Sequence, residues 1–220
     1  MPPETTILAF DTSAAQCAAA LLSGDRIIVA QVEDMAKGQA ERLIPLLEEV
    51  LAEAGLRWAD LDAIGVGIGP GNFTGIRISV SAARGLALAL GKPAIGVSTF
   101  EALAEGTDGA ILASVAARAD ITYLQLLDTP VTSDPVMIEH TSVPRAMRRS
   151  DVTCIGHAAR DIAREIGANH AAPRFGMIEG IARTAARKLA SGQPQPRPAP
   201  LYVRAANAAP PRDPAVVILP

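Results

Sequence analysis

The most constraining feature of this sequence is a glycine-rich segment, GIGPGNFTGIRISV, at residues 67–80. Residues 61–68 form a short apolar run, which predicts a buried strand, and residues 74–90 repeat apolar side chains at helical spacing, which predicts a helix. A strand, a tight turn and a helix in this order are typical of α/β proteins, in which the free N–H groups of the helix can accept an anion. We therefore expect an α/β protein with a candidate anion-binding loop.

The rest of the chain repeats a similar order of elements. In the first half, we predict strands at 6–10, 17–22, 27–32 and 94–97, and helices at 39–54 and 98–104. In the second half, we predict strands at 110–115, 121–127, 136–140 and 152–155, and helices at 143–149, 158–166 and 177–190. The repeat lies in element order and not in residue identity. It divides the chain into an N-terminal lobe at 1–104, a smaller C-terminal lobe at 105–205 and a flexible tail at 206–220.

Composition narrows the class of protein. Aromatic residues make up 3% of the chain, so aliphatic side chains must fill the core, as they do in α/β layers. The formal net charge of −3 does not demand a nucleic-acid partner. The cluster Arg145, Arg148 and Arg149 could meet phosphates, but a charged helix face is usually only solvated, so we expect tRNA contact to be indirect or weak.

The cysteines and the N-terminus bear on location. Cys17 and Cys154 lie in separate apolar stretches, which favours buried thiols in a reducing compartment. The N-terminus has no basic region ahead of an apolar run, and we find no uninterrupted apolar run of about 20 residues. We therefore expect a cytoplasmic protein with no membrane association.

The glycine segment fails both common nucleotide-binding templates. A Walker loop needs a lysine, and the nearest downstream cation is Arg77. A Rossmann fingerprint needs a third glycine where this chain has Asn72. The structural alternative is that Gly69 and Gly71 permit a close backbone passage and that Thr74 caps the following helix.

Helices 39–54 and 74–90 are apolar on more than one side. A surface helix normally carries a single apolar face. Helix 74–90 is apolar nearly all round, and many of its residues are small. Its second face must therefore be covered either by another part of this chain or by a partner protein.

Three strings in the first half carry a family resemblance: ILAFDTS, GQAERLIPLLEEVL and IGVGIGPGNFTGIRISVSAARGLALALGKPAIGVSTFEAL. Together they resemble the bacterial TsaB (YeaZ) family, densely over residues 6–104 and loosely beyond, in AARADITYLQL and PLYVR. The resemblance implies two ribonuclease-H-like lobes of the actin and sugar-kinase (ASKHA) superfold, with βββαβα repeated and the second lobe reduced.

The resemblance also implies a role. Members of this family pair with the catalytic subunit TsaD through a helix bundle, and the ATPase subunit TsaE joins them. They are required for threonylcarbamoyl transfer to the adenosine next to the anticodon in tRNA, without transferring the group themselves. We therefore expect a TsaD heterodimer, a homodimer of the chain alone, and a partner-binding face made by Leu43, Leu47, Val50, Ile76, Val80, Ala83 and Ala87.

The nucleotide site of the superfold is expected to be degenerate here. The turn Asp11-Thr12-Ser13 is retained, but Ala116 stands where relatives usually carry Asp, and no Gly-Gly dipeptide or paired histidine is present. HExxH and G-x-S-x-G protease motifs are also lacking. We assign no catalytic residue, no metal site and no cofactor to this chain, while partner subunits use ATP and a metal. The degenerate phosphate loop comprises Asp11, Thr12, Ser13, Gly69, Gly71, Thr74, Gly75 and Arg77.

An alternative remains open. The chain could be a nucleotide-binding ATPase or phosphotransferase of the same fold, using Asp11, Thr12 and the loop at 69–75.

Overall fold

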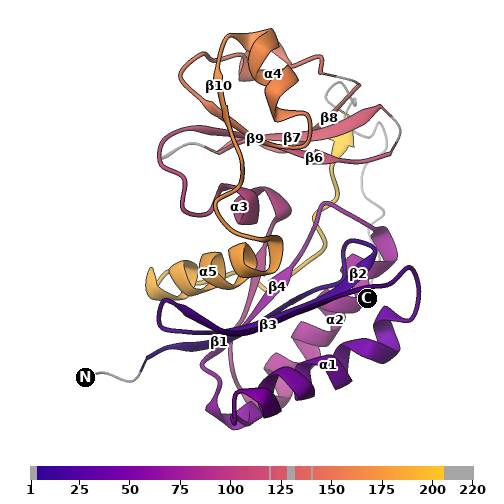
Figure 1. Ribbon diagram of the computed structural model, residues 1–220, viewed down its shortest axis with the longest axis vertical. Coiled ribbons are helices and arrows are strands. Elements are labelled where there is room, and N and C mark those ends of the chain that lie inside the picture. The colour runs from indigo at the N-terminus through magenta and orange to yellow at the C-terminus, as the bar shows by residue number, and fades with distance from the viewer. Residues whose placement is uncertain (1–3, 119, 128–131, 140, 206–220) are drawn as a thin grey trace, which may run out of the picture.

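The computed structural model describes residues 4–118, 120–127, 132–139 and 141–205, arranged around two β-sheets (Figure 1). His140, the last residue of the predicted strand at 136–140, and the predicted tail at 206–220 lie outside these residues. The first sheet has the strand order β3-β2-β1-β4-β5 and the second β10-β9-β6-β7-β8-β11. The two sheets, each with its own helices, are the two lobes that the sequence predicts.

The first sheet begins as an antiparallel meander. It runs through β1 (Thr6–Asp11), β2 (Gln16–Ser23) and β3 (Arg26–Asp34). Two parallel strands follow, β4 (Ala63–Gly67) beside β1 and β5 (Ala94–Val97) at the edge. Helix α1 (Gln39–Glu53) precedes β4, and α2 (Phe73–Leu90) joins β4 to β5. Every residue of β1 and β4 is buried, as expected for strands covered on both faces.

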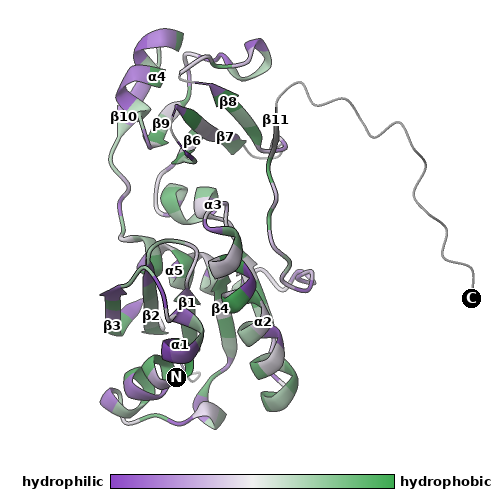
Figure 2. Cartoon of the chain, turned by 90° about the vertical axis from the view of Figure 1, so that its right-hand side faces the viewer, coloured by the Kyte–Doolittle hydropathy of each residue, from purple (hydrophilic) through white to green (hydrophobic). Residues whose placement is uncertain are grey.

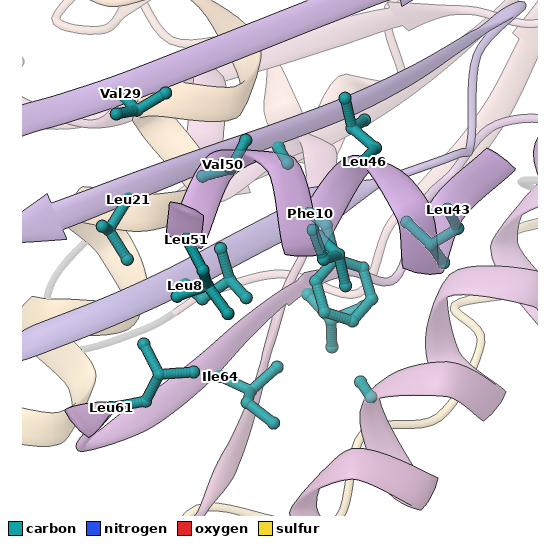
Figure 3. Close-up of a cluster of buried hydrophobic side chains, with 14 of the residues drawn as sticks. Leu8, Phe10, Leu21, Val29, Leu43, Leu46, Val50, Leu51, Leu61 and Ile64 are labelled. Atoms are coloured by element: carbon teal, nitrogen blue, oxygen red, sulfur yellow. The ribbon is translucent and has the colours of Figure 1, made fainter. Parts of the chain in front are cut away.

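Two apolar clusters cover the two faces of this sheet. On one face, α1 and α2 pack on Leu8, Phe10 and Ile64, as Figure 3 shows for α1. On the other face, α5 (Met177–Ala190) packs on β1, β2 and β4. The sheet is therefore the middle layer of a three-layer sandwich (Figure 1).

The second sheet repeats the meander. Its strands are β6 (Ile111–Ala116), β7 (Ile121–Leu127), β8 (Val136–Glu139), β9 (Thr153–Gly156), β10 (Asn169–Ala171) and β11 (Arg204–Ala205). Helix α4 (Ala159–Ile166) lies between β9 and β10 in the chain and packs on both. Helix α3 (Thr99–Ala104) contacts both α5 and β6, so it lies between the lobes (Figure 1).

Helix α5 belongs to the second half of the sequence but packs on the first sheet. Lys188 of α5 forms an ion pair with Glu101 at 2.7 Å and donates to the Gly96 carbonyl at 2.9 Å. Arg187 pairs with Glu105 at 3.0 Å. The boundaries 1–104 and 105–205 were drawn along the sequence, and they stay a prediction. In space, helix α5 from the second range packs on the sheet of the first lobe.

A few elements differ from the sequence prediction. The predicted helix at 143–149 is a single 3₁₀ turn, Arg145–Met147, and a second such turn, Trp58–Asp60, was not predicted. The short strands β10 and β11 were also missed, because two or three residues carry no periodic signal.

Candidate functional site

The predicted phosphate-loop residues come together at one edge of the first sheet. Strands β1 and β4 are parallel neighbours, so their carboxyl ends meet, and each continues into a turn there. The Asn72 N–H donates to the Ser13 carbonyl at 2.6 Å, and the Thr12 hydroxyl donates to the Gly75 carbonyl at 2.6 Å. The turn at 11–13 and the loop at 69–75 are therefore bonded directly to each other.

The glycines of this loop permit the close contact. A Cβ added at Gly75 would overlap the Thr12 carbonyl, and one at Gly71 would lie 2.5 Å from the Ser13 carbonyl. Gly69 has a left-handed φ of +90°, which favours glycine. The backbone of the turn at 11–13 thus lies directly against these glycines. This is the close backbone passage that the sequence left as an alternative.

Asp11 is buried beneath the two turns, with 2% of its surface exposed. Its Oδ2 accepts hydrogen bonds from the Ser13 N–H at 3.1 Å and the Ser13 hydroxyl at 2.9 Å. Among the residues that the structure describes, nothing donates to its buried Oδ1. Burial raises the pKa of Asp11, and the two Ser13 hydrogen bonds oppose that shift without cancelling it.

The cap of α2 corrects one prediction. Asn72, not Thr74, is the N-cap: its side-chain oxygen accepts from the Gly75 N–H at 2.9 Å, and Thr74 is exposed. The helix begins one residue earlier than predicted, which places asparagine in the capping position. Asparagine is among the preferred N-caps, so the signal was present in the sequence.

The side chain of Arg77 on α2 contacts Tyr202, a residue of the segment that follows α5. Its guanidinium lies 3.8 Å from the centre of the Phe73 ring, and its Nε donates to the Tyr202 hydroxyl at 3.1 Å. The Phe73 and Tyr202 rings are 5.5 Å apart, and both side chains are about half exposed. Sequence reasoning missed Tyr202, because nothing local connects it with the glycine loop.

The turn of the second lobe faces that of the first across a cavity of about 510 Å³. Asp11, Ser13 and Asn72 line it from one side, and Ala116, Arg118 and Tyr123 from the other. The geometry of the two-lobe fold is therefore retained, but Ala116 offers no carboxylate. The backbone N–H groups of Asn72 and Gly75 are already used within the chain, by the Ser13 carbonyl and the Asn72 side chain.

The cysteines and the two described histidines form no metal cluster. Cys17 and Cys154 are free and buried, as predicted, and burial raises the pKa of each thiol to about 11. His157 and His170 are exposed. Within the described part of the chain, no three His, Cys, Asp or Glu side chains gather in a way that could hold a metal.

The predicted partner-binding side chains need a correction. Six of them are buried in the first lobe, with at most 2% of their surface exposed, namely Leu43, Leu47, Val50, Ile76, Val80 and Ala83. Figure 3 shows Leu43 and Val50 directed toward the strands of the sheet. The seventh, Ala87, is partly buried against the same cluster. The strongest apolar stripe of each helix packs on this chain's own sheet, so a partner could contact only the outer faces.

The outer faces of α1 and α2 retain exposed apolar residues. Ile44 on α1 is 39% exposed, and Leu88 on α2 is 81% exposed. Helix α2 is long and apolar enough to cross a membrane by length and composition alone, whereas we predicted no membrane association. Its inner face, however, packs on the sheet, and its outer face carries Arg77 and Arg84.

Comparison with known proteins identifies the family that the chain resembles. The family model described as TsaD, tRNA N6-adenosine threonylcarbamoyltransferase, matches residues 30–171. A relative named tRNA threonylcarbamoyladenosine biosynthesis protein TsaB, from Escherichia coli, is 38% identical over 122 residues, covering 53% of this chain and 52% of the relative. A tRNA N6-adenosine threonylcarbamoyltransferase from Erythrobacter litoralis is 30% identical over 210 residues, covering 87% of this chain and 58% of the relative. The chain thus spans little more than half the length of these curated relatives.

Solved structures agree on the fold. YeaZ from Pseudomonas aeruginosa superposes with a TM-score of 0.70 at 27% identity, covering 90% of this chain and all of the other. A ROK hexokinase from Thermus thermophilus has a TM-score of 0.55 at 15% identity, covering 83% of this chain and 98% of the other. The second likeness concerns the fold alone, and it agrees with the predicted sugar-kinase superfold.

Proposed function

Because the chain belongs to the tRNA N6-adenosine threonylcarbamoyltransferase (TsaD) family, and within it to the TsaB and YeaZ proteins, we propose that it is an accessory subunit in threonylcarbamoyladenosine biosynthesis on tRNA. In this proposal it pairs with a TsaD-type catalytic subunit. It does not itself transfer the threonylcarbamoyl group to the adenosine next to the anticodon.

The observation that carries the noncatalytic role is the direct bonding of the glycine loop to the turn at 11–13. A phosphate cradle offers free backbone N–H groups, whereas here the Asn72 N–H is used by Ser13 and the Gly75 N–H by the Asn72 side chain. Ala116 removes the carboxylate that a second phosphate turn would supply. Both features support a degenerate catalytic site.

The outer faces of α1 and α2 are the proposed partner surface. Both helices are anchored to the sheet by their inner faces, so the exposed Ile44 and Leu88 are presented on a rigid support. Exposed apolar residues on a well-packed helix pair favour docking to another protein, because the partner excludes water from them at little entropic cost. TsaE as a third subunit, and a homodimer of the isolated chain, remain part of the proposal.

The test is the mass of the complex with the TsaD-type subunit of the same organism. We expect light scattering to give the summed mass of the two chains for the wild type. The double variant Ile44→Glu, Leu88→Glu should elute as a free chain, because an unpaired charge buried in an interface is costly. Ile28→Glu is the matched control, since Ile28 is similarly exposed, at 40%, but lies on β3. A double variant that still coelutes with the partner would refute the assigned face.

The alternative function is nucleotide binding in the cavity of about 510 Å³ between the lobes. Asp11 and the hydroxyl of Ser13 line that cavity, which is the observation in favour of this role. Calorimetry with ATP and magnesium separates the two functions. Heat that is lost on Asp11→Ala would support the ATPase or phosphotransferase, and no heat from the isolated chain would exclude it. Under the main proposal, ATP and metal bind the partner subunits.

A further inference from the structure

A groove runs beside α2 at the open edge of the first sheet. One wall is the C-terminal half of α2, with Arg84 and Leu88, and the floor includes Ala94 and Ile95 of the edge strand β5. The other wall is the segment at 191–203 that follows α5, which we call the strap. Figure 2 shows the strap rising from the level of α2 toward β11. The groove has a volume of about 440 Å³.

The charges of this groove are of one sign. Its charged lining residues are Arg84 on α2 and Arg197 on the strap, accompanied by the amides of Gln193 and Gln195, and none of the described lining residues is acidic. No described residue forms an ion pair or a side-chain hydrogen bond with either arginine. Unpaired guanidinium groups on both sides of one groove favour a ligand that brings carboxylates.

Between the two arginines the groove is apolar. Leu88 stands on the rim with 81% of its surface exposed, and Ala87, Ile95 and Leu189 lie deeper. A large apolar side chain seated here would cover Leu88, and carboxylates on either side of it would reach the arginines. Interfaces commonly place an apolar anchor inside a charged or polar rim.

The strap is fixed before any partner arrives. The Leu201 N–H donates to the Ile68 carbonyl at 2.9 Å, and Pro198 is buried next to Gly96. At its far end Tyr202 bonds Arg77 on α2 at 3.1 Å. These contacts fix the strap over residues 198–202, and a wall that is already fixed costs little conformational entropy when a ligand binds.

We propose that the groove between α2 and the strap binds a segment of the TsaD-type partner that presents one large apolar side chain between carboxylates. This inference rests on the proposed function and adds the strap to the docking surface. It also gives the partner's chemistry, which the exposed residues of α1 and α2 alone do not specify.

The test uses the full chain and its TsaD-type subunit, with the dissociation constant measured by calorimetry at low and high sodium chloride. The variant Arg84→Glu, Arg197→Glu should weaken binding at least about tenfold, because like charges would face the partner's carboxylates. The milder Arg84→Gln, Arg197→Gln should give a smaller loss. High salt should weaken the wild type and leave the glutamine variant nearly unchanged. Arg160→Glu is the control, since Arg160 is an exposed arginine on α4 in the other lobe.

The outcomes separate this inference from the proposed function. If the wild type binds the partner and both groove variants bind equally well at both salt concentrations, the groove inference is overturned and the accessory role stands. If the wild type does not bind at all, the accessory role fails and the inference with it. If the variants abolish only self-association of the isolated chain, the groove holds a second copy and the proposed occupant is wrong.

Discussion

Gly75 and Gly85 lie on the same helix, and an added methyl group would meet very different surroundings at each. At Gly75 it would overlap the Thr12 carbonyl, which is backbone and cannot turn aside, whereas nothing lies within 4 Å at Gly85. We expect Gly75→Ala to lower the free energy of unfolding by about 1–3 kcal/mol or more. Gly85→Ala should raise it by up to about 1 kcal/mol, because alanine favours an exposed helix. Urea unfolding of both variants measures this, and equal shifts would contradict the backbone contact.

Asp11 should make stability depend on pH. In the folded chain burial raises its pKa above the ordinary value of 3.8, to which it returns on unfolding. Between the two pKa values the folded state binds more protons, so the free energy of unfolding falls as pH rises through that window. Asp11→Asn removes this titration. Its free energy of unfolding relative to wild type should therefore grow as the pH rises above about 4, and a difference that stays constant would show that Asp11 titrates normally.

At the scale of single elements, the start of α2 offers two residues that could cap the helix, Asn72 and Thr74. The sequence alone does not decide between them. Asn72 accepts the Gly75 N–H and Thr74 is exposed. Asn72→Ala should cost about 1 kcal/mol of unfolding free energy, the usual value of a lost N-cap, and Thr74→Ala should change it by less than about 0.5 kcal/mol. Thermal unfolding of the two variants decides between the caps, and the reverse order would restore Thr74 as the cap.

Most helices and strands could be predicted from the sequence. Which side of α1 and α2 faces the sheet could not. The predicted ranges 94–97, 121–127 and 177–190 coincide with β5, β7 and α5, because turn residues or proline bound these runs. In α1 and α2, however, apolar residues occur on two sides, so periodicity cannot say which stripe meets the sheet. Leu47 and Ala83 were assigned to a partner and are core residues. The exposed Leu88 of α2 could be identified only once the sheet was in place.

At the scale of the whole molecule, helix α5 from the end of the chain packs on the first sheet, which the start of the chain forms. Periodicity predicted α5 but not its neighbours, because contacts between residues as far apart in sequence as Thr184 and Glu105, 79 positions, leave no local pattern. The Thr184 hydroxyl donates to Glu105 at 2.8 Å, and Gly180 lets α5 approach the backbone of α3 closely. The first lobe is therefore completed by the second half of the sequence.

This arrangement predicts that residues 1–104 do not fold alone. Without α5, the buried face of the first sheet that includes Ile7, Ala63 and Ile95 would meet water. Ile178 and Ile181 of α5 alone each contribute about 1.5–3 kcal/mol by burial, a large share of the roughly 5–15 kcal/mol that stabilises a domain. We expect the fragment to aggregate or to lack a cooperative thermal transition by circular dichroism. Joining residues 174–203 to it through a flexible Gly/Ser linker should restore the transition, because the apolar face is covered again. If the fragment of residues 1–104 melts cooperatively at the wild-type temperature, α5 contributes little to the stability of the first lobe, and the prediction is wrong.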